Sequence, residues 1–196
     1  ATCAHLSDVW DGMGSIVEVR LQIGASDERH CVVKVVAMPP RVIPTKHARK
    51  YASYKAEKSF YAAGYAERLY AAGAHCPQPL HITSDAETGV PMSLCLTRLQ
   101  GARVTHGMTS AHVGAALAWL ARLHATFWGP RADEAVLQGG MQAQGCFWHL
   151  DGRSEEHQQM PVHGWQGRLQ LAARAIDERL KADRFQTICH GDAKSD

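Results

Sequence analysis

A carboxylate and an ammonium group stand two residues apart in His190-Gly191-Asp192-Ala193-Lys194, near the end of the 196-residue chain. Phosphoryl transfer asks a protein mainly for positioning and for neutralisation of charge. An aspartate that aligns an acceptor hydroxyl and a lysine that faces the phosphoryl group meet both needs. We therefore predict Asp192 and Lys194 as catalytic residues. The alternative is a solvent-exposed Asp-Ala-Lys turn without chemistry.

The histidine of this motif invites a second interpretation, because His190 and Asp192 could form part of a metal site. No third ligand stands at a spacing that would complete such a site, so we predict no metal ligand here. We interpret His190 as a residue that supports the loop by bonding backbone groups.

A single lysine, Lys34, interrupts the apolar run from Cys31 to Val36. Taken alone, it is typical of an edge-strand lysine whose ammonium reaches water. The functional interpretation is a strand lysine that neutralises the α- and β-phosphates of ATP, which requires an acidic partner on a nearby helix. Glu57 stands in the next predicted helix, on about the same face as two tyrosines. We predict an ion pair of about 3 to 4 Å between Lys34 and Glu57.

The segment Gly12-Met13-Gly14-Ser15 precedes the first predicted strand. Glycines let the backbone come close to phosphates, and exposed N–H groups bind phosphate oxygens. We therefore predict Gly12, Gly14 and Ser15 as nucleotide-binding residues. The third glycine of a G-x-G-x-x-G loop is missing, with Val17 in its place, and a plain turn is the alternative.

Hydrophobic periodicity divides the chain into a strand-rich part, residues 1–100, and a helical part, residues 101–196. We predict strands at 16–23, 31–36, 81–83 and 93–96. We predict helices from about Lys46 to Ala72, from Ser110 as N-cap to the stop at Gly129-Pro130, and from Trp165 to about Ala182. The predicted fold class is α+β.

Composition excludes several classes of protein. A chain with 45% hydrophobic and 20% charged residues is ordinary globular material, and its net charge of +2 argues against attraction to nucleic acid or membranes. No apolar run approaches the length of a membrane span. The six cysteines form no C-x-x-C pair, which favours reduced thiols in a cytoplasmic protein.

Four stretches resemble a known group of enzymes: Val9–Ile16, Arg49–Glu57, Leu117–Ala125 and His190–Lys194. A fifth, Cys146–Arg153, resembles a segment of bacterial and algal members of that group. Together the stretches resemble the aminoglycoside phosphotransferase and choline kinase superfamily, most of all its ecdysteroid kinase-like branch. The last of the four is specific to the superfamily, whereas the others are specific to the branch only in combination.

The resemblance implies a bilobal protein-kinase-like fold, with an antiparallel-sheet lobe followed by a mostly helical lobe. It implies ATP and Mg²⁺ as co-substrates and a small-molecule hydroxyl as the acceptor. The adenine is expected against the connector from Leu94 to Leu99, with Leu96 among the residues that contact the nucleotide. Members of the superfamily usually carry an acidic pair in the connector, where Thr97-Arg98 stands here.

In loops of this kind an Mg²⁺-binding asparagine lies five positions after the aspartate, which here would be the residue after Asp196. We therefore expect the front part of a phosphotransferase, with the first lobe and part of the second. Such a part would bind adenine nucleotide weakly and would transfer no phosphate by itself.

Two alternative functions follow from the same residues. A protein kinase is disfavoured by Gly191 in place of arginine and by the incomplete glycine-rich loop. A pseudokinase or a nucleotide-binding interaction module stays open, because the residues that would decide it lie beyond Asp196. The acceptor is not predicted: Trp148 and His149 could line its pocket, or could form a packed aromatic with a capping histidine.

Overall fold

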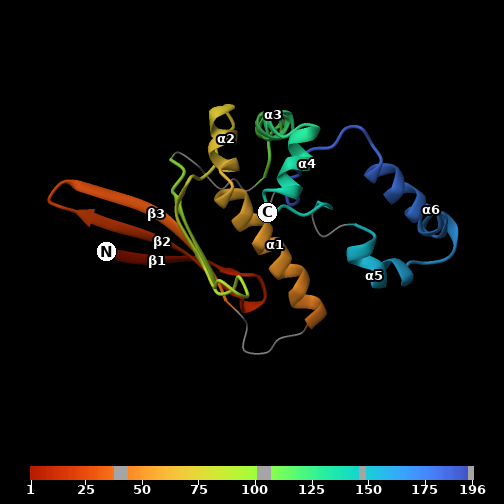
Figure 1. Ribbon diagram of the computed structural model, residues 1–196, viewed down its shortest axis with the longest axis horizontal. Helices are drawn as coiled ribbons and strands as arrows, with labels where there is room; N and C mark the ends of the chain where they lie inside the picture. Colours follow the sequence, from red (N-terminus) through yellow and green to blue (C-terminus); the bar gives the residue numbers. More distant parts are fainter. Residues whose placement is uncertain (38–43, 101–106, 146–148, 194–196) are drawn as a thin grey trace. The chain divides into compact units, whose positions relative to one another are not determined.

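The computed structural model describes residues 1–37, 44–100, 107–145 and 149–193, and divides into two compact units, Ala1–His106 and Gly107–Asp196. The first unit holds all the described strands, and the described part of the second is helical (Figure 1). The predicted α+β class is therefore confirmed. The division predicted at residues 100 and 101 borders a range that is not described, and it stays a prediction.

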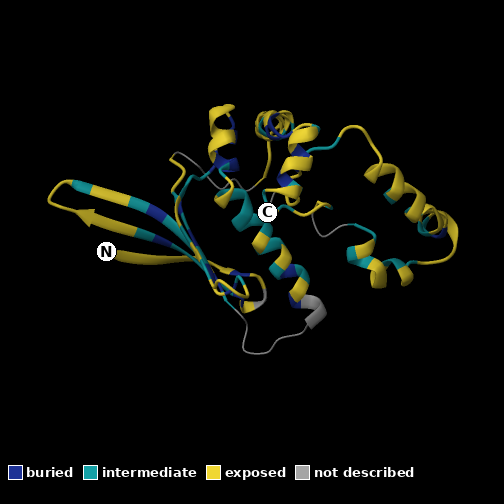
Figure 2. Cartoon of the chain, viewed as in Figure 1, coloured by how far each residue is buried: buried dark blue, intermediate teal, exposed yellow. Residues whose placement is uncertain are grey.

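The first unit is built on a five-stranded antiparallel sheet with the order β1-β2-β3-β5-β4 (Figure 1). Its strands are β1 (Thr2–Val9), β2 (Gly14–Ile23), β3 (Asp27–Val36), β4 (Pro79–Ser84) and β5 (Met92–Thr97). The four predicted strands are present, each longer than predicted. The sequence did not predict β1, which lies at the edge of the sheet and has only its last residue buried (Figure 2).

The helix predicted from Lys46 to Ala72 is wrong as a single element. It is two helices, α1 (Pro44–Ala62) and α2 (Tyr65–Ala71). Gly64 between them has a φ of 74°, a left-handed conformation that glycine adopts without steric penalty. The continuous helical periodicity concealed this break.

Helix α1 packs on the sheet face that carries the even-numbered residues of β2 and β3. The core of this contact is a cluster of Val9, Met13, Val36, Val90 and Met92, with Ile16, Tyr51 and Tyr54 packed against it. Because Tyr51 and Tyr54 lie one turn apart on α1, the cluster fixes both the position and the rotation of the helix. The same face of the sheet carries Lys34.

Strand β2 was predicted correctly in its extent, but its apolar side is not its buried side. Leu21 and Ile23, on the face away from α1, are 38% and 56% exposed. Glu18, on the face toward α1, is only 5% exposed. The alternation of residue types therefore identified the strand and gave the wrong buried face.

The second unit consists of helices α3 (Ser110–Thr126), α4 (Pro130–Leu137), α5 (Ser154–Gln158) and α6 (Gly164–Lys181), with a 3₁₀ turn η2 at Asp151–Arg153. The predicted helix from Trp165 is confirmed as α6. The N-cap of α3 is Thr109 rather than Ser110, because the Thr109 side chain accepts the N–H of His112 at 3.3 Å. Among the described residues, no helix combines the length and apolar character that a membrane span requires, and five cysteines are free thiols.

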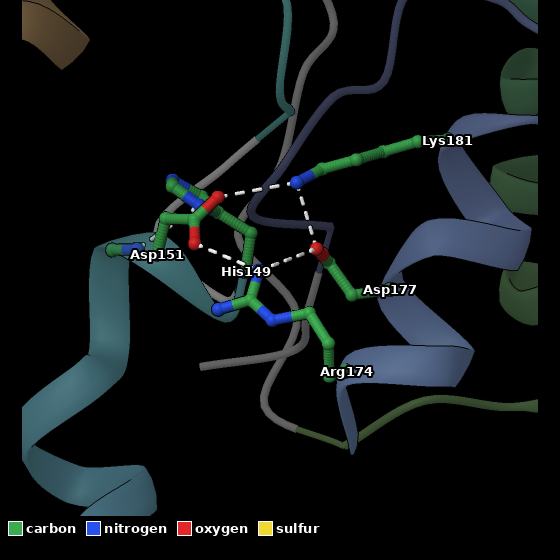
Figure 3. A network of polar contacts seen from close by, with 6 residues as sticks. His149, Asp151, Arg174, Asp177 and Lys181 are labelled. Carbon is green, nitrogen blue, oxygen red and sulfur yellow. Dashed lines mark hydrogen bonds and ion pairs between the residues drawn. The ribbon is translucent and has the colours of Figure 1, made fainter. Parts of the chain in front are cut away.

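A network of charges joins η2 to α6 (Figure 3). Arg174 and Lys181 of α6 each donate to the carboxylate of Asp151 at 3.1 Å. Lys181 also lies 2.7 Å from Asp177, one turn earlier on the same helix. These contacts hold the residues around His149 against α6, although 151 and 174 are far apart in the sequence.

The pH dependence of this network can be tested. The hydrogen bond from Lys181, followed by that from Arg174, lowers the pKa of Asp151. A carboxyl whose pKa is lowered by folding stabilises the fold above its unfolded pKa, about 3.9, and loses that effect as the pH falls through the folded pKa. Asp151→Asn should therefore lower the melting temperature at pH 7 by at most a few degrees, and the difference should vanish below about pH 3.

Thermal unfolding between pH 2.5 and pH 8 measures this effect. Glu178→Gln is the matched control, since this residue also lies on α6 and has no side-chain contact among the described residues. An equal loss for the two variants at pH 7 would contradict the role given to Asp151.

Candidate functional site

Lys34 and Glu57 form the ion pair predicted from the sequence. The Lys34 Nζ lies 2.5 Å from Oε2 of Glu57, closer than the predicted distance, and the two side chains are 17% and 35% exposed. Lys34 lies on β3, the middle strand of the sheet, so the edge-lysine interpretation is wrong. Its neighbours on the same face are Ile16 of β2 and Leu94 of β5.

Helix α1 brings three side chains to this region. Lys50, Tyr54 and Glu57 are four and three residues apart, a spacing that places them on one side of a helix. Glu57 pairs with Lys34, the Tyr54 ring centre lies 4.9 Å from the Lys34 Nζ, and the Lys50 Nζ lies 4.3 Å from the Trp10 ring centre. Consecutive turns of α1 therefore contact both β3 and the turn between β1 and β2.

This turn is η1 (Trp10–Gly12), followed by Met13. Met13 is fully buried, its N–H donates to the carbonyl of Trp10 at 3.3 Å, and its carbonyl accepts the N–H of Ala37 at 2.7 Å. The loop that the sequence identified is thus anchored at the end of β3, near Lys34 in the sheet.

The two glycines of the loop have different structural reasons. Gly12 has a φ of 66°, and a Cβ there would meet nothing within 4 Å. Gly14 pairs with Val36, and its Cβ would lie 1.9 Å from the carbonyl oxygen of Val35. Close contact between strands is therefore sufficient to require glycine at position 14. A role of either residue in phosphate binding stays a prediction.

The register does not bring the Ser15 side chain to Lys34. Ser15 pairs with Val35, whereas Lys34 pairs with Ile16. Successive side chains of a strand point to opposite faces, so the Ser15 hydroxyl lies on the face away from Lys34. Leu96, in contrast, pairs with Val32 on the Lys34 face and is buried.

The connector after β5 is held from two directions. The N–H of Thr97 donates to the carbonyl of Gln78 at 2.8 Å, and its hydroxyl accepts the Gln78 N–H at the same distance. The Nε of Arg98 lies 2.7 Å from the buried carboxylate of Glu18 on β2. Thr97 and Arg98, the departure from the usual acidic pair, thus both have defined structural partners.

Sequence reasoning missed Glu18, which gathers three cationic side chains. Besides Arg98, its carboxylate accepts a hydrogen bond from Arg20 at 3.1 Å and lies 3.5 Å from the Nδ1 of His30. The hydrogen bond from Arg20 is the main cause that lowers the pKa of Glu18. No local signal identified it, because a glutamate that alternates with apolar residues is typical of an exposed strand face.

The predicted catalytic loop lies in the second unit and is held along α3. Gly129 N–H donates to the Gln186 carbonyl at 2.9 Å, and the Thr187 hydroxyl donates to the His124 carbonyl at 2.9 Å. The rings of His190 and Trp119 meet edge to face at 5.8 Å. Residues 186–190 thus run antiparallel to α3, with no regular secondary structure.

Asp192 follows at an exposed position. Its N–H donates to the Nδ1 of His190 at 3.3 Å, and Gly191 between them has a φ of 82°. This contact confirms His190 as a histidine that supports the loop through a backbone group. Lys194 lies outside the described residues, as does Trp148. His149 accepts the N–H of Gly152 at 3.1 Å, which is the capping role that the sequence left open.

The structure thus brings the predicted residues together in two groups, each within its own unit. Lys34, Glu57 and the Gly12 loop belong to the first, and Asp192 to the second. The described residues contain no group of three or more histidine, cysteine, aspartate or glutamate side chains that could hold a metal ion.

Comparison with known proteins gives one finding. The model of a family described as APH, the phosphotransferase enzyme family, matches residues 22–196. No curated protein and no solved structure matches the chain significantly.

The contact at Gly14 yields a stability test. Gly14→Ala should lower the free energy of unfolding of the first unit by about 3 kcal/mol or more, because backbone strain adds to a collision with β3. Gly12→Ala is the control, where strain alone should reduce it by about 1–2 kcal/mol. Urea unfolding measures both values, and equal losses would show that the contact with Val35 does not decide the residue at position 14.

Proposed function

Since the chain belongs to the phosphotransferase enzyme family, we propose that it is part of an ATP-dependent kinase that phosphorylates a hydroxyl group of a small molecule. The observation that carries this proposal is the Lys34–Glu57 pair. It places a partly buried ammonium on the middle strand, close to the Gly12 loop. The ecdysteroid kinase-like branch is our proposal for the position of the chain within the family.

The residues of the first unit fit the phosphates of a nucleotide. ATP, when bound, supplies the γ-phosphoryl group, and Lys34 neutralises charge on the phosphates. Glu57 holds the ammonium in place, so that the lysine is oriented before the nucleotide arrives. The base is proposed to lie along the connector, where buried Leu96 provides apolar contact and backbone groups provide hydrogen bonds.

The acceptor is proposed to meet Asp192. Its hydroxyl oxygen forms a bond to the transferred phosphorus while the bond from phosphorus to the leaving nucleotide oxygen breaks. The hydroxyl proton passes to the Asp192 carboxylate, which gives a phosphate ester and ADP. His190 and Gly191 fix the backbone of Asp192, and we propose that Lys194 faces the phosphoryl group.

Mg²⁺ is part of this proposal only through the family resemblance. Among residues 1–37, 44–100, 107–145 and 149–193, no cluster of metal-binding side chains fits the ion. No step of the mechanism is therefore derived through it.

The role of Lys34 predicts a selective loss of nucleotide binding. Lys34→Ala should weaken MgATP binding roughly 10- to 150-fold, the range for a lost charge-assisted hydrogen bond. Arg29→Ala is the matched control, because it removes one positive charge from the same strand at an exposed ion pair with Asp27. Isothermal titration calorimetry on the 196-residue chain measures both, and equal affinities for all three proteins would refute the nucleotide site.

The role of Asp192 predicts a different pattern. In the active enzyme, Asp192→Asn should reduce kcat by roughly 10²–10⁴-fold, the contribution of a positioned proton acceptor, and should leave MgATP affinity nearly unchanged. Phosphoryl transfer to a panel of alcohols provides the rate, and calorimetry provides the affinity. Activity close to that of the wild type in this variant would exclude the mechanism. MgATP binding without transfer to any alcohol would favour a nucleotide-binding module instead.

A further inference from the structure

The structure assigns Tyr54 a role beyond packing: we propose that its ring positions the Lys34 ammonium for phosphate binding. The inference rests on the proposed nucleotide role of Lys34. Tyr54 is a positioning residue in this account, because it acts on the lysine and not on the nucleotide.

The geometry places Lys34 between two side chains of α1. Its Nζ lies 2.5 Å from the Glu57 carboxylate and 4.9 Å from the centre of the Tyr54 ring. The second distance is within the range of about 6 Å over which a ring face attracts a cation. Because Tyr54 and Glu57 are three residues apart on one helix, both reach the lysine from the same element.

The ring has a fixed support. Tyr54 packs against the cluster that holds α1 on the sheet, which includes Val36 and Met92 of the strands beside Lys34. Burial, and then the negative charge of Glu57, raises the pKa of Tyr54, so the phenol stays neutral at physiological pH. The ring therefore presents an uncharged, immobile face to the ammonium.

A ring and a carboxylate hold an ammonium in different ways. The carboxylate accepts an N–H and cancels the charge that attracts a phosphate. The ring attracts the cation through its quadrupole and adds no net charge and no strong acceptor. Tyr54 can therefore restrict the flexible lysine chain without competing with phosphate oxygens, and leaves N–H groups of Lys34 available to the nucleotide.

The experiment compares variants that keep or remove the ring. Tyr54→Phe keeps the ring face and should bind MgATP within about two-fold of wild type. Tyr54→Leu keeps apolar volume but removes the ring, and should weaken binding by about 2- to 30-fold, the range of a cation–π contact. Calorimetry with MgATP on the 196-residue chain measures both, and circular dichroism verifies that each variant is folded.

A second measurement separates electrostatics from packing. Phenylalanine with one, two or three ring fluorines, incorporated at position 54, weakens the quadrupole stepwise with little change in shape. The logarithm of the MgATP dissociation constant should rise in step with the number of fluorines. A merely structural role of Tyr54 predicts no such trend, and this series remains decisive if Tyr54→Leu does not fold.

The outcomes are distinguishable from failure of the proposed function. If Lys34→Ala weakens MgATP binding while the fluorinated series is flat, the role of Tyr54 is refuted and the nucleotide site stands. A loss in Tyr54→Phe as large as in Tyr54→Leu would also refute it, since the hydroxyl would then be the active part. If Lys34→Ala binds MgATP as tightly as wild type, the proposed function itself fails.

Discussion

A positive charge in the middle of the sheet sets the arrangement of the first unit. An ammonium on a central strand loses much of its hydration, so it needs a partner close by. Glu57 is that partner, which requires α1 to lie on the Lys34 face of the sheet with one particular rotation. The cluster around Met13 and Met92 then packs on the same side and holds this arrangement. The apolar core and the charged pair thus demand the same helix position.

A second buried charge fixes the other end of the same sheet face. Glu18 holds Arg98 of the connector from β2, across the width of β3. Removing one partner of such a group would leave the other charges uncompensated, so the four side chains depend on one another. Lys34 and Glu18 lie two residue pairs apart along the strands, and each ties a different element to the sheet: α1 in one case and the connector in the other.

The sequence predicted what depends on local order and missed what depends on distant partners. The run around Lys34 identified a strand, and the helix after it offered an acidic residue at a suitable position. That pairing could be anticipated because one type of chemistry requires both residues. The partners of Glu18 come from two strands and the connector, and no residue near it indicates burial. Leu117 of α3 and Leu169 of α6 show the opposite limit, because their helical spacing is clear although they are 60% and 43% exposed.

The two groups of predicted residues are held in place by different physics. In the first unit, side chains fix side chains, so a change at Glu57 or Tyr54 acts directly on Lys34. In the second unit, the loop is held largely by contacts to its backbone: a carbonyl at Gln186 and an N–H at Asp192. Backbone anchoring leaves the identity of the exposed side chain open to the chemistry it performs. The Asp192 carboxylate is therefore required by the fold much less than Lys34 is, which makes it the residue whose presence is explained best by function.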